Sequence, residues 1–205
     1  MKDFDRKYEE ATKVFIPKGE NRSRVTELLV ERGEDLPEFT GRLLTVSNGR
    51  KEFGLRRDKD LPVLLGRDTN ALGFMGDDRF EELSATVRAD LGFVPVIETH
   101  ISFAIAAKSD RAQETSEAIR GGSTLTIATS YPNRVQVVAE ELGFGISEIV
   151  ELGGSVESAQ DDDPSIDAIF DIVDSGNTLR ENDMAIIQRS AGTLSVGAVW
   201  STEAN

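Results

Sequence analysis

Cysteine is absent from this chain of 205 residues, and histidine occurs once, at His100. The lack of cysteine excludes disulfides, thiolate catalysis and cysteine-ligated metal. A single histidine, between two apolar segments, fits a structural role better than a hydrolase triad. Basic residues are also few, 23 against 37 acidic ones, which leaves a net charge of −14 at pH 7. This balance argues against nucleic acid or an anionic membrane as the partner.

Long apolar runs are missing as well. No stretch of about 18 apolar residues could span a membrane. The first residues lack the apolar core of a signal peptide, so we expect a cytoplasmic protein. A hydrophobic content of 39% with a charged content of 29% is typical of soluble globular proteins. A chain of this length can bury a substantial core, in one domain or in two small lobes.

Short apolar segments alternate with segments of helical periodicity. Strands are expected at residues 14–16, 71–74, 102–107, 124–128, 148–152, 167–173 and 195–200. Helices are expected at 24–32, 60–65, 78–83, 109–119, 133–142 and 181–189, and a hairpin at 43–46 and 52–56. Residues 1–12 are expected to form a loosely held leader, and 158–165 an exposed acidic loop. This alternation predicts α/β layers with parallel strands.

The most informative segment is residues 171–180, DIVDSGNTLR, between an apolar run and a helix-compatible run. A strand, a small polar turn and a helix place backbone N–H groups around a phosphate. Ser175 and Thr178 add hydroxyl donors, and Gly176 allows close approach of the backbone. Asp171 and Asp174 suit a ribose phosphate, whose hydroxyls need acceptors. Helix capping is the alternative interpretation of the same residues.

Five further segments accompany this one in a recognisable order. They are residues 15–19 (FIPKG), 57–62 (RDKDLP), 71–78 (ALGFMGDD), 127–133 (IATSYPN) and 154–157 (GSVE). Together the six segments resemble the ATP phosphoribosyltransferase family, over roughly residues 13–199. The resemblance implies an α/β, two-lobed, periplasmic-binding-protein-like type II fold with the site in the interlobe cleft. Lobe I would be 1–99 plus 190–205, and lobe II, with the phosphoribosyl loop, 100–189.

The resemblance also implies roles for individual residues. The 5′-phosphate of phosphoribosyl diphosphate would be held by the loop residues Asp174, Ser175, Gly176, Asn177 and Thr178. Asp171 and Glu157 would face the ribose or a metal, and the resemblance does not identify the metal ligands. Glu157 is equally compatible with an ordinary exposed turn.

Outside the loop, Lys18 would lie on the cleft side, with a solvated lysine as the alternative. Arg42 and Arg57 are candidates for binding pyrophosphate, because guanidinium groups match phosphate oxygens. Since Arg56 precedes Arg57, and alternate strand residues face opposite ways, only one of this pair can face the cleft. Tyr131 would line the nucleotide end or pack in the core.

The implied reaction joins N1 of ATP to the ribose of phosphoribosyl diphosphate and releases pyrophosphate, with Mg²⁺, as the first step of histidine biosynthesis. The chain resembles the short, catalytic-subunit form, which implies an oligomer with a regulatory subunit resembling histidyl-tRNA synthetase. Two residues depart from the family pattern: Glu20 replaces an arginine and Ser130 a lysine. A non-catalytic module that binds a phosphometabolite is therefore the main alternative, and a periplasmic solute receptor of the same fold is a third.

Overall fold

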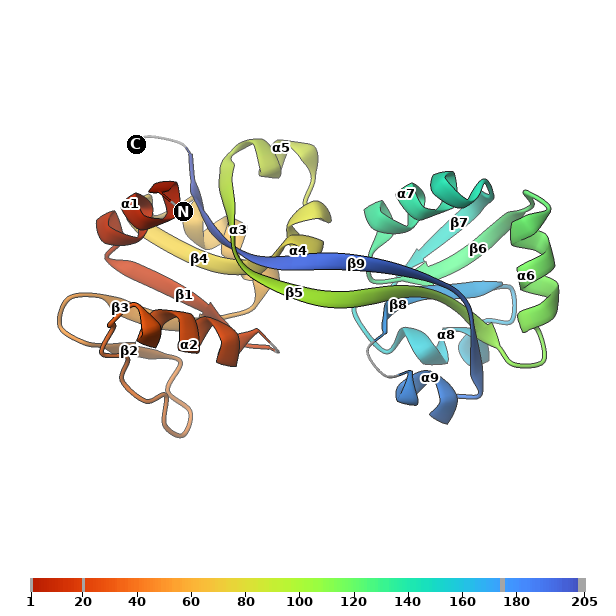
Figure 1. Ribbon diagram of the computed structural model, residues 1–205, viewed down its shortest axis with the longest axis horizontal. Helices are drawn as coiled ribbons and strands as arrows, with labels where there is room; N and C mark the ends of the chain where they lie inside the picture. The colour runs from red at the N-terminus through yellow and green to blue at the C-terminus, as the bar shows by residue number, and fades with distance from the viewer. Residues whose placement is uncertain (1, 20, 174–175, 203–205) are drawn as a thin grey trace. The chain divides into compact units, whose positions relative to one another are not determined.

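The computed structural model describes residues 2–19, 21–173 and 176–202, and the side chains of these except at 99, 100 and 191–193. Contacts divide the chain into two units (Figure 1). The first unit is Met1–Thr99 with Leu194–Asn205, and the second is His100–Thr193. The chain leaves the first unit within strand β5 (Leu91–Lys108) and returns within strand β9 (Met184–Ser201). No helix among the described residues is long and apolar enough to cross a membrane.

The first unit is built on a mixed sheet with short helices around it. Its elements besides β5 and β9 are α1 (Lys2–Glu10), β1 (Lys13–Pro17), α2 (Arg22–Glu31), β2 (Thr45–Ser47), β3 (Glu52–Arg56), η1 (Asp58–Asp60), α3 (Leu61–Leu65), β4 (Ala71–Gly76), α4 (Asp77–Glu81) and α5 (Ala85–Ala89). The strand order is β2-β3-β1-β4-β9. β1 runs parallel to both β3 and β4, while β9 is antiparallel to β4. The predicted hairpin is confirmed, because β2 and β3 pair antiparallel.

Helix α1 corrects the expectation of a loosely held leader. Phe4 and Tyr8 are 0% and 1% exposed and belong to the same core cluster as Val14 and Trp200. Lys51, itself buried, donates from Nζ to the carbonyls of Tyr8 and Ala11, each at 2.6 Å. Carbonyls at a helix C-terminus lack partners within the helix, so this ammonium group satisfies them. The helix is therefore an integral part of the first unit.

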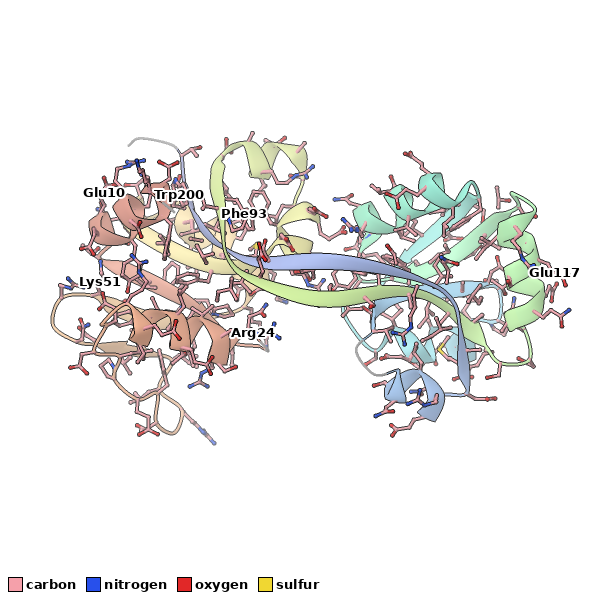
Figure 2. The ribbon with its side chains drawn as sticks, in the orientation of Figure 1. Glu10, Arg24, Lys51, Phe93, Glu117 and Trp200 are labelled. Carbon is pink, nitrogen blue, oxygen red and sulfur yellow. The ribbon has the colours of Figure 1, made fainter. Side chains whose placement is uncertain are left out.

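Two aromatic rings lie on glycines where β5 and β9 enter the first unit. A Cβ atom at Gly92 would collide with the indole of Trp200, and a Cβ at Gly197 with the ring of Phe93. Figure 2 labels both aromatic residues on these strands. Because glycine has no side chain, each aromatic ring can pack directly on the backbone of the facing strand. These contacts hold β5 and β9, within the first unit, against its core.

The second unit is a smaller α/β layer. It contains α6 (Ala112–Arg120), β6 (Thr124–Thr129), α7 (Pro132–Leu142), β7 (Gly145–Glu151), η2 (Val156–Ser158), α8 (Ala159–Asp162), β8 (Ala168–Val173) and α9 (Asn177–Glu181), with parts of β5 and β9. The strand order is β5-β8-β6-β7. β6 is parallel to β7 and to β8, whereas β5 is antiparallel to β8. The parallel strands expected from the sequence are present as β7, β6 and β8, and the antiparallel strand β5 makes the sheet mixed.

Two local predictions in this unit are wrong. The predicted helix 181–189 is absent, since α9 ends at Glu181 and β9 begins at Met184. Asp183 has a φ of 53°, a left-handed conformation that ends a helix. The predicted acidic loop at 158–165 contains α8, whose Gln160 is 5% exposed and donates to the carbonyls of Ile166 and Asp167. A buried amide with its own partners, rather than solvent, orders this segment.

Candidate active site

The candidate residues of the first unit gather where three parallel strands end. Because β3, β1 and β4 run in the same direction, their carboxyl ends share one edge. Arg57 and Asp58 follow β3, Lys18 follows β1 and Asp77 follows β4. Ligands of open α/β sheets bind outside the carboxyl ends of the strands. The first unit therefore presents its ionisable side chains on the edge where this class of fold binds ligands.

Beside this edge lies a cavity of about 440 Å³, which we call the cationic hollow. It is lined by Lys18, Arg22, Arg42, Phe39, Gly41, Leu43, Leu44 and Leu55. Three cations converge on it, and none of the described residues that line it is acidic. In a chain with a net charge of −14, such a concentration of positive charge is a local feature of the fold. Guanidinium and ammonium groups around an apolar floor suit a phosphate or pyrophosphate anion.

Arg22 is a further cation of the hollow and follows the 15–19 segment closely in the sequence. It begins α2, and its guanidinium lies 5.4 Å from the centre of the Phe39 ring. Lys18 directly follows β1, and its backbone N–H donates to the Arg56 carbonyl at 2.8 Å. The structure thus brings together Lys18 and Arg42, which the sequence proposed as site residues, and adds Arg22. Glu20 lies outside the described residues.

The neighbouring pair Arg56 and Arg57 separates into two environments. Arg56 donates from Nη1 to the carbonyls of Leu55 at 2.8 Å and Leu44 at 3.3 Å, and from Nη2 to the Thr45 hydroxyl at 3.4 Å. These bonds hold its guanidinium against the sheet. Arg57 is exposed, and it does not line the cationic hollow. Arg57 is therefore the arginine of this pair that faces solvent at the strand ends.

Asp58 and Asp78 form an acidic pair at the same edge that the sequence did not suggest. Asp78 is 11% exposed in its side chain, and its carboxylate folds onto Gly76, where a Cβ would block it. Arg79 Nε lies 3.8 Å from an Asp78 oxygen. Burial, and then the charge of Asp78, raise the pKa of the Asp58 carboxyl to about 6, against an opposing effect of Arg79. Asp58 is thus hard to ionise in the folded chain.

Replacing Asp58 with asparagine should stabilise the protein at high pH. Asp58 has a folded-state pKa of about 6 against a usual value of 3.8, so between these values the folded chain binds more protons than the unfolded chain. Stability contributed by this group is therefore lost as the pH rises from about 4 to about 6. We expect Asp58→Asn to raise the free energy of unfolding at pH 8 by on the order of 1–3 kcal/mol and to change it little at pH 4. Denaturant titrations at both pH values test this; an equal effect at the two would contradict it.

In the second unit the candidate residues also follow the carboxyl ends of parallel strands. β8 ends at Val173 and α9 begins at Asn177, which confirms a strand before this segment and a helix after it. Gly176 precedes α9 with a φ of 73°. A residue with a Cβ is strained in this left-handed conformation, so the turn requires glycine. Asp174 and Ser175 lie outside the described residues.

The side chains after Gly176 differ in the hydrogen bonds that they form within the protein. Asn177 and Thr178 are both exposed. The Asn177 side-chain oxygen accepts from Arg180, whereas the Thr178 carbonyl accepts from Asn182 Nδ2 at 2.8 Å. In the part of the chain that the structure describes, the Thr178 hydroxyl has no protein partner. It can therefore donate to a ligand without losing an internal bond.

Two carboxylates accompany this turn. Asp171, on β8, is half-buried, and its Oδ1 accepts from the N–H of Ile172 at 2.8 Å. Glu157 is half-buried in η2, beyond the end of β7, after Ser155 with a φ of 51°. Both side chains keep part of their surface available to solvent. Either can accept a hydrogen bond from a sugar hydroxyl or contribute an oxygen to a metal.

Tyr131 lies in the core of the second unit. It is 4% exposed, and its ring meets Phe103 edge-on at 5.2 Å. Phe103 in turn stacks on Phe170 at 5.1 Å. These contacts favour the packing alternative for Tyr131 over a place at the nucleotide. The preceding Ser130 donates to the Leu152 carbonyl at 2.9 Å, which ties the end of β6 to the segment after β7.

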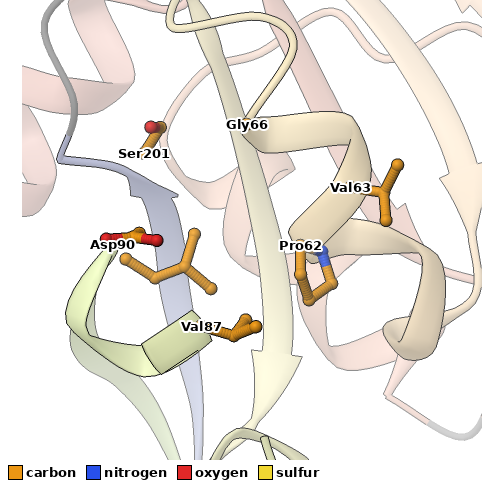
Figure 3. A pocket seen from close by; sticks show the side chains of 7 residues that line it. Pro62, Val63, Gly66, Val87, Asp90 and Ser201 are labelled. Atoms are coloured by element: carbon orange, nitrogen blue, oxygen red, sulfur yellow. The ribbon is translucent and has the colours of Figure 1, made fainter. Parts of the chain in front are cut away.

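A second hollow in the first unit lacks the chemistry of a phosphate site. It has a volume of about 190 Å³ and is lined by Pro62, Val63, Gly66, Val87, Asp90, Leu91 and Ser201 (Figure 3). Among the described residues that line it, Asp90 alone is ionisable, and its negative charge would repel an anion. Among the described residues, no group of three or more acidic or histidine side chains could hold a metal ion.

Comparison with known proteins matches residues 57–196 to the family described as HisG: ATP phosphoribosyltransferase. An ATP phosphoribosyltransferase of Rubrobacter xylanophilus is 33% identical over 75% of this chain and 70% of its own. In structure, the ATP phosphoribosyl transferase (HisG:HisZ) complex of Thermotoga maritima matches 92% of this chain and 87% of that one, at 25% identity and a TM-score of 0.66. The Candida albicans CA3427 gene product, with the generic periplasmic binding protein fold, matches 94% of this chain and 63% of its own, at 14% identity and a TM-score of 0.60. The last likeness concerns the fold alone. The chain belongs to the ATP phosphoribosyltransferase family.

Proposed function

We propose that this protein transfers the phosphoribosyl group of phosphoribosyl diphosphate to N1 of ATP and releases pyrophosphate, the first step of histidine biosynthesis. The observation that carries the proposal is the family match over residues 57–196, which includes the turn at Gly176. The cationic hollow supports it independently, because it offers a site for a strongly anionic group in an acidic protein. We place the enzyme in the cytoplasm, where both substrates are made.

The reaction needs positioning more than proton transfer. The bond between C1 of the ribose and the pyrophosphate oxygen breaks, its electron pair leaves with pyrophosphate, and the N1 lone pair of adenine forms the new bond to C1. Positive charge develops on the ribose while negative charge grows on the leaving group. Fixed cations beside the leaving group therefore lower the barrier. A chain without cysteine and with one histidine is compatible with such a mechanism.

The proposed roles follow the two units. In the second unit, Asp174 to Thr178 bind the 5′-phosphate, with Asp171 and Glu157 towards the ribose hydroxyls. In the first unit, Lys18, Arg22 and Arg42 bind the pyrophosphate in the cationic hollow. Arg57, exposed at the end of β3, supplies a further guanidinium for the phosphates at that edge.

The family requires a divalent metal, and we propose Mg²⁺. Proteins hold Mg²⁺ with one or two carboxylates together with substrate phosphates, rather than with a protein cage. The described residues fit this pattern, because Asp171 and Glu157 are half-buried carboxylates and no larger acidic cluster exists among them. When bound, the ion would neutralise charge on the pyrophosphate. Asp171 and Glu157 would orient the ribose by accepting hydrogen bonds from its hydroxyls.

The phosphoribosyl loop is tested by removing the Thr178 hydroxyl. Thr178→Ala should weaken binding of ribose 5-phosphate about ten-fold, because a hydrogen bond to a charged group is lost. The change should not affect folding, since the hydroxyl has no protein partner among the described residues. Thr178→Ser is the matched control, because it keeps the donor and should retain the affinity. Calorimetry that finds equal affinity for Thr178→Ala and the parent protein would remove Thr178 from the site.

We further propose that the chain assembles with a regulatory subunit that resembles histidyl-tRNA synthetase, in a hetero-oligomer. The support is the likeness to the Thermotoga maritima protein, which is described as a HisG:HisZ complex. The expected result is a weakly active isolated chain whose turnover rises when such a subunit is added. Full activity of the isolated chain, unchanged by the added subunit, would contradict the proposal.

A non-catalytic phosphometabolite-binding module is the second candidate. Glu20 stands where the family has an arginine, and Ser130, in place of a lysine, is bonded to the Leu152 carbonyl. Both departures remove positive charge. Arg22 in the cationic hollow offsets one of them, because it brings a guanidinium to the turn after β1. This compensation is why we favour the enzyme.

A further inference from the structure

The cationic hollow depends on an irregular segment, residues 33–44, which we call the Arg42 loop. The loop contains neither helix nor strand, yet it supplies Phe39, Gly41, Arg42, Leu43 and Leu44 to the lining of the hollow. Among the described residues, no backbone hydrogen bond ties 35–42 to another element; a single bond, Leu43 N–H to the Thr40 carbonyl at 3.1 Å, closes a turn within the loop. The position of Arg42 is therefore determined by the attachments at the two ends of the loop and by its apolar contacts.

The two ends are attached in different ways. At the far end, the Leu44 carbonyl accepts from the Leu55 N–H at 2.8 Å and from Arg56 at 3.3 Å. At the near end, the Glu34 carboxylate is 4% exposed. It accepts from Asn48 Nδ2 at 3.2 Å and forms an ion pair with Arg50 Nη2. Both of these donors belong to the turn between β2 and β3.

A buried carboxylate is costly unless it is paired and hydrogen-bonded. Here the pairing connects the loop to a hairpin turn that is itself held to α1, because Lys51 of the same turn donates to the carbonyls at the end of that helix. Leu36 and Phe39, the other attachments of the loop, are apolar and only partly buried in the core cluster. Backbone bonds from the Gly33 N–H to Val30 at 2.9 Å and from the Glu34 N–H to Leu29 at 3.0 Å tie the start of the loop to α2, and the Glu34 side chain ties it to the turn between β2 and β3.

We propose that Glu34, held by Asn48 and Arg50, is a positioning residue that sets the affinity of the cationic hollow for pyrophosphate. It does so by holding the Arg42 loop in the conformation that directs Arg42 into the hollow. The inference rests on the proposed function, in which the hollow binds the pyrophosphate group. A small displacement of a binding group can cost a large factor in rate or affinity, so the anchor of a loop can matter as much as the ligand contact.

The sign of the effect separates positioning from electrostatics. Glu34 is negative, so removing its charge should, by charge alone, strengthen the binding of an anion. Positioning predicts the opposite for Glu34→Ala, which removes the acceptor from Asn48 and Arg50. Glu34→Gln loses the same charge but keeps the shape of the side chain and one acceptor oxygen, which can still accept from Arg50. The two variants therefore match in charge and differ in the anchor.

The experiment is calorimetry of pyrophosphate with the full chain. Glu34→Ala should weaken pyrophosphate binding about ten-fold, whereas Glu34→Gln should stay within about two-fold of the parent protein. Ribose 5-phosphate, which probes the second unit, should bind all variants equally. Leu65→Ala is the stability control: it removes a fully buried side chain of α3 that lines neither the hollow nor the Arg42 loop, so it should lower the melting temperature and leave the pyrophosphate affinity unchanged.

Arg42→Met, measured in parallel, distinguishes failure of this inference from failure of the proposed function. If Arg42→Met leaves pyrophosphate binding unchanged, the hollow is not the pyrophosphate site, and both proposals fall. If Arg42→Met weakens binding while Glu34→Ala and Glu34→Gln bind equally well or better than the parent protein, only the positioning role is overturned. Equal weakening in Leu65→Ala would likewise overturn it, by showing that general destabilisation of the first unit is the cause.

Discussion

Arg42→Met should lower kcat/KM for phosphoribosyl diphosphate by about 100- to 1,000-fold, the usual effect of removing a fixed donor from a group that gains charge in the transition state. Arg42 is exposed in the cationic hollow and, among the described residues, forms no ion pair or hydrogen bond within the chain. Its loss should therefore not unfold the protein. Methionine keeps most of the length of the side chain, so the measured loss reports the guanidinium.

The matched control for this prediction is Arg24→Met. Arg24 lies on α2 outside the hollow, and its guanidinium contacts only the Asn21 side chain, at 3.5 Å, in the part of the chain described (Figure 2). Both substitutions remove one positive charge from the first unit. Steady-state kinetics in which Arg24→Met and Arg42→Met lose activity equally would show that only the overall charge matters, and would contradict a specific pyrophosphate site.

Tyr8→Ala should lower the free energy of unfolding by about 3–5 kcal/mol, as for other aromatic residues removed from a core. Domains of this kind have a total stability of about 5–15 kcal/mol, so the loss is a large fraction of it. Tyr8 is 1% exposed, and its ring contacts Phe4 at 5.6 Å and lies under the Lys51 ammonium at 4.7 Å. Without it, α1 loses both its core contact and the ring beneath its capping lysine.

Tyr8→Phe separates the ring from the hydroxyl. The hydroxyl is buried beside the Glu34 carboxylate and forms no hydrogen bond of good geometry among the described residues. Burial, and then the charge of Glu34, raise the pKa of Tyr8, so the group stays neutral at any pH of interest. We expect Tyr8→Phe to change stability by less than about 1 kcal/mol. Denaturant unfolding followed through Trp200, the one tryptophan of the chain, measures both variants. A loss below about 1 kcal/mol for Tyr8→Ala would restore the interpretation of α1 as a loose leader.

The alternation of strands and helices was predictable because each short apolar run is bounded by turn residues, as at 71–76 and 124–129. The helix expected at 181–189 was wrong because its local composition permits either structure, and the left-handed Asp183 decides it. Strand β5 spans Leu91–Lys108 and is longer than the predicted 102–107. The prediction was too short because Pro95 and Glu98 interrupt the apolar pattern of the sequence. Pairing with a long neighbouring strand overrides that interruption.

The core role of α1 had a readable signal. Phe4 and Tyr8 are four residues apart, which places both on one face of a helix. The surrounding charges hid this spacing. For the site, the sequence named Lys18 and Arg42, and the structure places both at one cavity. Arg22 and Glu34 could not be found in the same way, because their roles arise from the closure of the Arg42 loop, a tertiary feature without a local pattern.

The measurement that tests the central claim most directly is product formation. The chain, with and without a regulatory subunit, is incubated with ATP, phosphoribosyl diphosphate and Mg²⁺, and the products are followed by mass spectrometry. We expect ATP carrying a phosphoribosyl group on N1, formed in equal amount to pyrophosphate, and lost in Arg42→Met. Binding of phosphoribosyl diphosphate without any such product, under both conditions, would contradict the account and identify the chain as a binding module.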